Sequence, residues 1–421
     1  MTTIIFSGGN ITSDAGAILF SSFLGASRLF DSFALLPFQD ERKDPVHTCH
    51  DILAQLVFKV LLGYFNQSDQ SVLDRDPLFD FDAASQSTVS RFFQHALPSL
   101  NNAFHELLQK TAMDHLDRVD HDLILDADST CIETSGKQEG VAYIPHYKTT
   151  GLHPLLINEY YSKLLVASSL RYGNTYSSNG TIELLDQVFA HLEPAFSRTI
   201  LFRGDSAFYS TKLMDYLEDL PCPVHYFIRC KHFGKLVQAC QDDMMDKGIE
   251  FTAYSQTNPY YGELSYPFGN KTRRVVYKAY QTMDKDGQLS LIPEIYAIMT
   301  DVDWTPRNTM RFYEQRGNSE NYTKELKDDF GAGKLSQKTF MANELNFLIK
   351  GFAYNVYHLF LHKAVRKMRV VFIMRMNTFR KAFIKVGGKV IKHARRKTLC
   401  MSSAYPRQEQ FDQLYKNIQF E

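Results

Sequence analysis

Apolar residues recur at helical spacing through the first part of the chain. The clearest run lies between Ile52 and Tyr64, where pairs of apolar side chains return once per helical turn. This period is typical of an amphipathic helix. It predicts that residues 1–120 are mostly helical.

A short polar helix is expected within this region. Ser87 is a suitable N-cap for a helix that begins at Thr88 and presents Ser90 and Arg91. Exposed hydroxyl and guanidinium groups on a short capped helix are compatible with DNA contacts, although an ordinary surface helix has the same pattern. Ser90 and Arg91 are therefore candidate DNA-binding residues, and 1–120 is a candidate DNA-binding region.

From residue 121 the pattern changes to short apolar strands that alternate with helices. The expected strands span 123–128, 155–160, 164–170, 199–205 and 224–228, with helices over 182–192 and 207–217. This order predicts an α/β fold with a mixed sheet over 121–230. Two strands end in a carboxylate, at Asp128 and Asp205, and open α/β sheets place their chemistry at such strand ends.

Three segments complete the expected organisation. Residues 231–305 are strand-rich and are interpreted as a β-rich insertion, residues 306–358 turn helical and complete the α/β core, and residues 359–421 form a basic helical C-terminal region. The strands expected in the insertion span 251–254, 274–280 and 295–299, between turn signals.

Charge is distributed unevenly along the chain. The 47 Lys and Arg residues balance 47 Asp and Glu residues, yet 13 of the basic residues and none of the acidic ones lie in 363–397. A concentrated basic segment predicts local binding to a polyanion, with a membrane surface as the alternative. The candidate DNA contacts here are Arg366, Lys367, Arg369, Arg395, Arg396 and Lys397.

Composition excludes several classes of protein. With 44% hydrophobic and 22% charged residues the chain is globular. Its six cysteines form no CxxC pair, which argues against a zinc ribbon or a disulfide framework. His47, Cys49 and His50 are interpreted as a solvated helix start and not as a metal site. Without an apolar run of spanning length or a secretory signal, we expect a cytoplasmic protein.

The strongest chemical signal is a set of four polar residues after residue 312. Tyr313, Arg316, Glu320 and Lys327 would share one arc about 60° wide on a continuous helix. Such a face suits phosphate oxygens, although a solvated charged stripe has the same spacing. Gly317 weakens a helix by up to about 1 kcal/mol, which a purely structural stripe has no reason to accept.

Asp128, Asp205 and Glu320 together form a candidate metal site. Two carboxylates at neighbouring strand ends and a third on a facing helix are enough to hold Mg²⁺, which prefers oxygen ligands and keeps several waters. Two such ions can clamp the attacking and leaving oxygens of a phosphoryl transfer. Asp126 competes with Asp128 for the first position, since both point to the same side of one strand.

These residues resemble the motifs of cut-and-paste DDE transposases of bacterial insertion sequences. Tyr313, Arg316, Glu320 and Lys327 match the Y-x2-R-x3-E-x6-K signature of one subgroup at every spacing. Asp128 precedes Ser-Thr as in the first acidic motif of the family, and Asp205 is similar to the second. The resemblance covers residues 40–355.

The resemblance implies a fold, a chemistry and partners. It implies a ribonuclease H-like core with a β-rich insertion, in which Asp128, Asp205 and Glu320 bind two Mg²⁺ ions, or Mn²⁺ in their place, and act as the catalytic residues. Tyr313, Arg316 and Lys327 would contact DNA near the cleaved end. The enzyme would act as an endonuclease that cleaves the terminal inverted repeats of its insertion sequence and joins the 3′-OH ends to target DNA.

The same resemblance implies a homodimer on double-stranded DNA, in a bacterial cell at the nucleoid and without a membrane partner. A catalytically idle DNA-binding protein derived from a transposase is the alternative. Trp304, the single tryptophan, lies just before the signature residues. A core position is expected for it, although stacking on an unpaired base is physically sensible.

Overall fold

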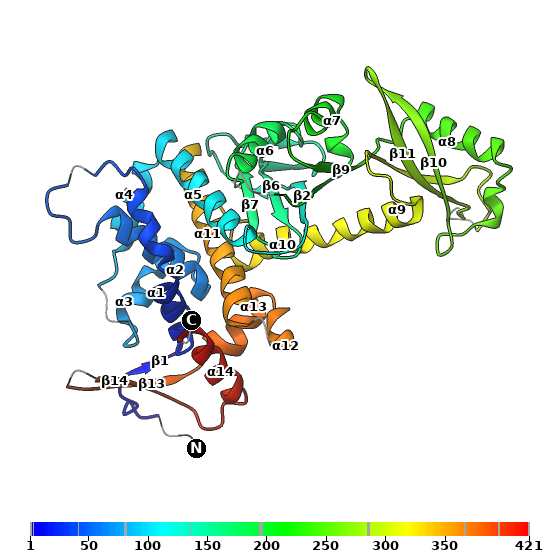
Figure 1. Cartoon of the computed structure of the whole chain (residues 1–421). Coiled ribbons are helices and arrows are strands. Elements are labelled where there is room, and N and C mark those ends of the chain that lie inside the picture. Colours follow the sequence, from blue (N-terminus) through cyan, green and yellow to red (C-terminus); the bar gives the residue numbers. More distant parts are fainter. Residues whose placement is uncertain are drawn as a thin grey trace.

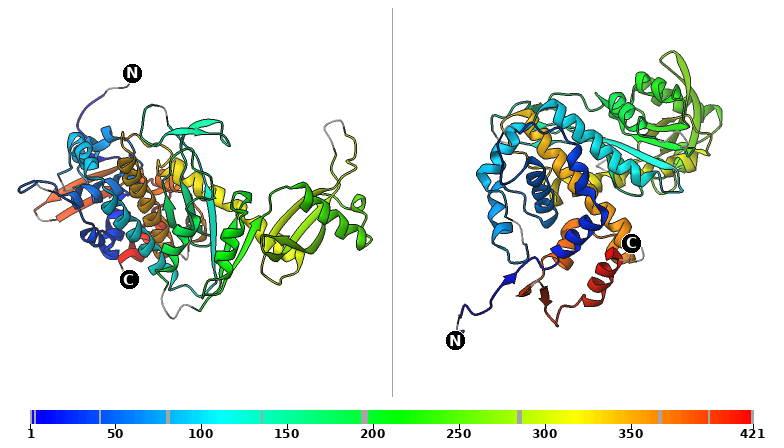
Figure 2. Two further views of the ribbon diagram at one scale, coloured as in Figure 1. Left: turned by 90° about the horizontal axis from the view of Figure 1, so that it is seen from above. Right: turned by 60° about the vertical axis from the view of Figure 1, so that its left-hand side comes forward.

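The computed structural model describes residues 2, 4–40, 42–79, 82–134, 136–192, 197–283, 287–365, 368–394 and 396–419. A helical region and a small β-hairpin lie at one end, a central sheet lies in the middle, and a β-rich arm projects at the other end (Figure 1). The two further views show the same arrangement, with the arm standing away from the rest (Figure 2).

The central sheet confirms the predicted mixed α/β architecture. The strands run β10-β11-β12-β9-β8-β2-β6-β7 across eight positions. β2 pairs in parallel with β8 and β8 with β9, whereas β6 and β7 add antiparallel strands on the other side of β2. The bounds are β2 Leu123–Ser129, β6 Leu155–Glu159, β7 Leu165–Ser169, β8 Ile200–Gly204 and β9 Val224–Arg229.

Both faces of this sheet are covered, which explains its near-continuous apolar strands. On one face Leu123 and Leu125 belong to a core shared with α6 (Thr181–Phe189) and α7 (Thr211–Glu218). On the opposite face Ile124 packs in a smaller core with Met310 and Tyr313 of α9 (Pro306–Glu314). The alternation of β2 residues between the two cores follows the period of two along a strand. A separate small sheet, β3 Ile132–Glu133, β4 Ala142–Ile144 and β5 Thr149–Leu152, follows β2.

The segment expected as an insertion extends the central sheet. It contains α8 Gly234–Asp246, η5 Phe251–Ala253, β10 Tyr260–Phe268, β11 Lys271–Tyr280 and β12 Glu294–Thr300. β12 pairs with β9, so the arm is a continuation of the sheet. The strand expected over 251–254 is wrong. These residues form a single 3-10 turn, closed by a 3.1 Å bond from the amide of Ala253 to the carbonyl of Glu250, because the next turn begins at Ser255 and leaves too few residues for a paired strand.

The first 120 residues contain five α-helices among their described residues. They are α1 Ala17–Ser27, α2 Cys49–Leu62, α3 Gln70–Arg75, α4 Gln86–Phe92 and α5 Pro98–Leu116, with short 3-10 turns at η1 Leu29–Leu35, η2 Gln67–Asp69 and η3 Phe93–His95. The expected cap of α4 is corrected: Ser85, and not Ser87, accepts a bond of 3.3 Å from the amide of Thr88, so the helix begins at Gln86.

The C-terminal part differs from the expected basic helix. After α11 (Phe340–Ala364) come α12 Arg369–Phe372, α13 Met376–Phe379, the π-helical turn η7 Arg380–Ile384 and then β13 Gly388–His393 and β14 Arg396–Met401, before α14 Gln408–Gln419. The helical expectation is wrong over Gly388–His393 and Arg396–Met401, which are strands. Gly387 and Gly388 disfavour a helix there, and β13 pairs with both β14 and β1 (Ile11–Thr12).

The two ends of the chain therefore share one core. α11 packs against α2 and α5, and α1 packs against α14. Among the described residues no single helix has the length and apolar composition to cross a bilayer; α1 and η1 meet that test only as a bent pair.

Candidate active site

Asp128 and Asp205 end neighbouring parallel strands. Asp126 of β2 lies opposite Arg203 of β8, so the two carboxyl ends meet at one edge of the sheet. Asp128 is two residues further along β2, and Asp205 directly follows β8. The Asp205 carboxylate also accepts a 2.8 Å bond from the amide of Ala207, which fixes the chain as it leaves the strand.

Asp126 lies in a different environment from Asp128. Its carboxylate accepts two bonds from the Arg203 guanidinium, at 2.6 and 2.8 Å, and both side chains are fully buried. Arg203 also lies over the rings of Tyr160 and Phe312. Asp126 thus belongs to an internal ion pair beneath the sheet edge, whereas Asp128 faces the cavity described below.

The signature residues do not lie on one continuous helix. α9 ends at Glu314, a 3-10 turn (η6) spans Gln315–Asn318, and α10 runs from Ser319 to Asp329. The predicted single arc is corrected on this point. Gly317 and Asn318 have low α-helix propensity, which favours a 3-10 turn at this point. The turn changes the direction of the Arg316 side chain relative to that of Glu320.

Arg316 connects the two strand ends. Its Nη2 donates to the carbonyl of Ala127 at 3.1 Å and to Oδ1 of Asp128 at 3.2 Å, and it lies 3.9 Å from Oδ2 of Asp205. Its side chain is 11% exposed. In this position the guanidinium offsets part of the repulsion between the two carboxylates.

Tyr313 and Lys327 hold the backbone around the same strand ends. The Tyr313 hydroxyl donates to the carbonyl of Gly204 at 3.1 Å, and burial raises the pKa of this phenol well above its usual range. Lys327 Nζ donates to Oγ1 of Thr130 at 3.2 Å and to the carbonyl of Cys131 at 2.7 Å. Tyr313 is buried and does not line the cavity described below, whereas Lys327 does.

Glu320, in the first turn of α10, lines the same cavity as both aspartates. The cavity measures about 970 Å³. The predicted residues that line it are Asp128, Asp205, Arg316, Glu320 and Lys327. The structure therefore brings together five of the predicted site residues from three separate segments of the chain.

The carboxylates affect one another's charge. Burial raises the pKa of Asp128 to about 6; Arg316 opposes this shift, and Asp205 and Glu320 add to it. The raised pKa of Asp128 indicates that the positive charge of Arg316 does not fully offset burial and the nearby charges of Asp205 and Glu320. The oxygen-only donor set and this deficit both fit a divalent cation such as Mg²⁺.

Other residues complete the cavity. His146, Tyr147 and His153 also line it, as do Tyr176 and Lys231, which sequence reasoning missed. Lys231 Nζ donates to the Tyr176 hydroxyl at 3.0 Å across the cavity wall. Lys231 comes two residues after β9, the third parallel strand, and that position was the one available signal for it.

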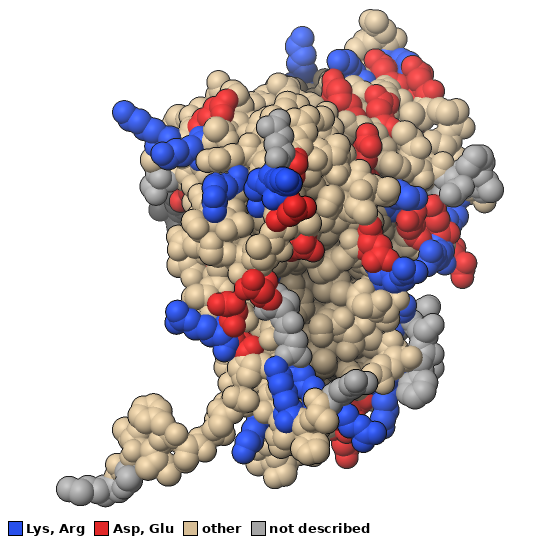
Figure 3. All heavy atoms as spheres, turned by 90° about the vertical axis from the view of Figure 1, so that its left-hand side faces the viewer, with Lys and Arg blue, Asp and Glu red and all other residues tan. Residues whose placement is uncertain are grey.

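The remaining DNA-contact candidates lie outside this cavity. Ser90 and Arg91 are exposed on α4, and Arg369, Arg396 and Lys397 are exposed near the C-terminus. Lys397 also donates to the carbonyl of Leu78. Arg366, Lys367 and Arg395 lie outside the described residues. On the face formed by the helical region and the hairpin, the visible Lys and Arg side chains are interspersed with Asp and Glu (Figure 3).

Trp304 packs against two other aromatic residues. Its ring centroid lies 5.3 Å from that of Phe227 and 5.2 Å from that of Phe312. The side of the ring that remains open leaves the residue 39% exposed. The core position expected from the sequence is therefore wrong: Phe227 and Phe312 cover only part of the ring, and Trp304 lies at the surface.

Comparisons with known proteins bear on the whole chain. A sequence model of the family described as transposase DDE domain group 1 matches residues 2–420. No curated protein matches the chain. Among solved structures, the piggyBac transposase in its synaptic complex with hairpin DNA matches with a TM-score of 0.47 and 12% sequence identity, over 88% of this chain and 81% of that chain.

Proposed function

The chain belongs to the transposase DDE domain group 1 family, and on this premise we propose that it cleaves the ends of its own insertion sequence and joins the 3′-OH ends to target DNA. One observation carries the proposal. Arg316 reaches both strand-end carboxylates, and Glu320 lines the same cavity.

Asp128, Asp205 and Glu320 are the proposed catalytic and metal-binding residues, with two Mg²⁺ ions or Mn²⁺ as a substitute. When bound, these ions would activate the attacking oxygen and stabilise the leaving oxygen of a phosphodiester. Asp128 is the proposed first acid in preference to Asp126, because Asp126 is fully buried in its pair with Arg203.

The cationic residues have separate proposed roles. Arg316 holds Asp128 in place and stands where a phosphate oxygen would approach the carboxylates. Lys327 fixes the loop that follows Asp128 through Thr130 and Cys131. Both line the cavity, so each can exchange a protein contact for a phosphate contact when DNA enters. Tyr313 positions the end of β8 through its hydrogen bond to the carbonyl of Gly204.

The strand order supports the finer description of the fold. Numbered along the chain, the five strands β2, β6, β7, β8 and β9 lie in the order 3-2-1-4-5, with the second antiparallel to the first. This agrees with the ribonuclease H-like core implied by the sequence motifs. Double-stranded DNA is the proposed partner, bound by a homodimer because two ends must be processed together.

The exposed basic residues outside the cavity, together with the hydroxyl of Ser90, are proposed DNA contacts of a simpler kind. Ser90, Arg91, Arg369, Arg396 and Lys397 would meet the backbone of the duplex, which gives affinity with little sequence readout. Arg366, Lys367 and Arg395 share this proposed role on the basis of sequence.

An excision assay tests the proposal. The substrate is a plasmid that carries a marker between the inverted repeats flanking the coding region. Asp205→Asn and Glu320→Gln are expected to abolish excision while the variants still bind the end DNA. Asp120→Asn and Glu106→Gln are matched controls, since both residues are exposed and lie outside the cavity.

The same assay separates the alternatives. Excision that persists in Asp205→Asn or Glu320→Gln would remove that residue from the catalytic set. Wild-type protein that binds the ends but never cuts them in Mg²⁺ or Mn²⁺ would favour the idle DNA-binding protein.

A further inference from the structure

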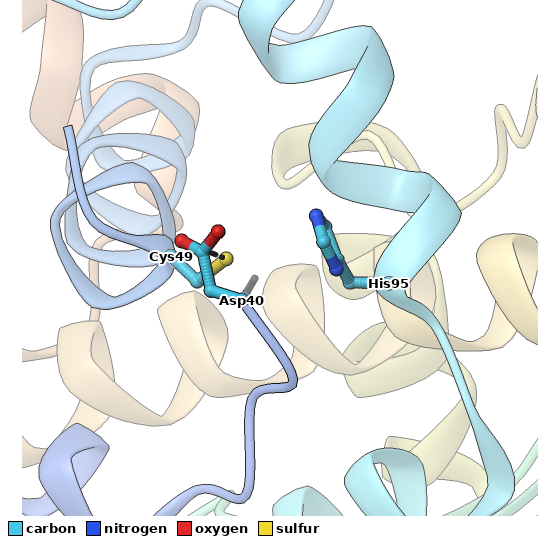
Figure 4. Close-up of side chains that lie close together, drawn as sticks. All are labelled: Asp40, Cys49 and His95. Carbon is cyan, nitrogen blue, oxygen red and sulfur yellow. Dashed lines mark hydrogen bonds between the residues drawn. The ribbon is translucent and has the colours of Figure 1, made fainter. Parts of the chain in front are cut away.

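Three side chains of different chemistry meet in the helical region, far from the carboxylate cavity in the sequence. They are Asp40, Cys49 and His95, and each offers one ligand atom within 4.8 Å of the others. Asp40 and Cys49 lie side by side, and His95 faces them from the end of η3 (Figure 4). None of the three lines the carboxylate cavity.

The fold fixes the backbone at two of these positions. Cys49 is the first residue of α2, which Thr48 and Asp51 close with a reciprocal capping box, and its side chain is almost completely buried. His95 ends η3, two residues after the buried Phe93. Because the capping box sets the backbone at Cys49 and the buried Phe93 sets it at His95, the thiol and the imidazole are held toward one point without a bond between them.

The positively charged side chain of Arg42 contacts Asp40 and Cys49. The Arg42 guanidinium donates to both oxygens of Asp40, at 2.7 and 2.6 Å, and its Nη2 lies 3.9 Å from Sγ of Cys49. The Arg42 side chain is 41% exposed, so it can turn into solvent without leaving a buried charge. Among the described residues the His95 ring has no hydrogen-bonding partner.

We propose that Asp40, Cys49 and His95 bind one Zn²⁺-class divalent cation in place of Arg42. A carboxylate oxygen, a thiolate and an imidazole are ligands that Zn²⁺ takes together in tetrahedral sites, and water would fill the fourth position. Binding releases the Cys49 thiol proton to solvent. Sγ of Cys49 already donates to Oδ2 of Asp40 at 3.5 Å, so only the His95 ring needs to move closer, by about 1 Å, to reach zinc bond lengths of about 2.0–2.3 Å.

Ligand chemistry sets this site apart from the carboxylate cavity. Three carboxylates suit a hard cation that keeps its waters, whereas sulfur and nitrogen ligands select a softer one. The cation would link the segment before α2 to the start of α2 and to η3. Its role is to fasten the helical region, independently of phosphoryl transfer at the sheet edge.

Cobalt(II) spectroscopy on the full, metal-free chain provides the test, because a thiolate ligand gives Co²⁺ a near-ultraviolet charge-transfer band that carboxylates do not give. The wild-type band is expected to saturate at one Co²⁺ per chain and to disappear on addition of Zn²⁺. Cys49→Ser should abolish the band, and His95→Ala should weaken Co²⁺ binding by at least about tenfold, the smallest loss usual even for an outer-shell partner.

Two matched variants keep the result specific. Cys400→Ser removes an exposed cysteine and Asp205→Asn alters the carboxylate cavity, and both should keep the full band. Arg42→Ala should tighten Co²⁺ binding, since it removes the competing cation. A wild-type chain without the band at millimolar Co²⁺, or a band that survives in folded Cys49→Ser, would overturn the proposal. Because His95 is only partly buried, His95→Ala keeps the test decisive if Cys49→Ser does not fold.

Discussion

Two aspartates that lie two residues apart on β2, Asp126 and Asp128, each pair with an arginine. The two pairs have the same chemical groups but differ in burial and in hydrogen bonding. Asp126 and Arg203 are fully buried and satisfy each other with two short bonds. Asp128 and Arg316 share a single bond of 3.2 Å and face a large cavity. The comparison teaches that access to solvent and unsatisfied bonding capacity, and not residue type, separate the structural pair from the pair proposed to act in catalysis.

The largest expected effect is the loss of activity in Asp128→Asn. Removing a proposed metal ligand should lower the rate of end cleavage by about 10⁴-fold or more, as removal of a central catalytic group commonly does. The folded state should remain at least as stable, because the amide replaces a carboxyl that resists ionisation. Cleavage kinetics on end DNA and urea unfolding measure the two parts.

A matched substitution sets the limit of that prediction. Asp126→Asn makes the same change two residues earlier on β2, where the carboxylate is buried in its pair with Arg203. Should Asp126→Asn, and not Asp128→Asn, abolish cleavage by protein that is still folded, the assignment of the first acid would have to be exchanged.

Asp126→Asn should instead cost stability. Removing one partner of a buried ion pair leaves the other charge buried without a counter-charge, which typically lowers the free energy of unfolding by about 3–5 kcal/mol. Urea unfolding measures this loss. The double variant Asp126→Leu with Arg203→Met should recover much of it, since well-packed apolar residues replace a buried ion pair at little cost. A single variant as stable as wild type would show that the pair is not structural.

Of the two aspartates, only the role of Asp128 could be predicted from the sequence. Asp128, Asp205 and the signature residues stood out because strand ends and helix spacing place them by local rules. Asp126 could not be separated from Asp128, because its partner Arg203 is distant in the chain and only strand pairing brings them together. The five strands that 121–230 contributes to the central sheet followed the same local rules and were predicted, whereas the short strands β3, β4 and β5 were not.

Non-local packing explains what the sequence did not show. The basic segment was expected to be helical because charge carries no information on strand pairing, yet β13 pairs with β1 from the opposite end of the chain. Arg380, expected as part of a basic surface, is buried and donates to the carbonyls of Val60 and Leu61. His95 had no local signal that related it to Cys49.

The smallest expected effect is the contribution of Asp128 to the pH dependence of stability. Its pKa is raised to about 6 in the folded chain, mainly by burial, whereas an unfolded Asp titrates near 3.9. Between these values the folded state holds the extra proton, so stability falls as pH rises through this window and levels off above it. For a side chain only 18% exposed, the expected loss is about 2–3 kcal/mol from pH 4 to pH 7.

Urea unfolding of wild type and Asp128→Asn in metal-free buffer isolates this contribution, because the two chains share every other titrating group. The difference in stability between them should grow from near zero at pH 4 to its full value at pH 7 in favour of the variant. Adding Mg²⁺ at pH 7 should stabilise the wild type and leave Asp128→Asn nearly unchanged, since a bound cation favours the ionised carboxylate. A difference that stays flat across this range would mean that Arg316 alone compensates the charge of Asp128, and the cavity would then lack the deficit of positive charge that favours a bound cation.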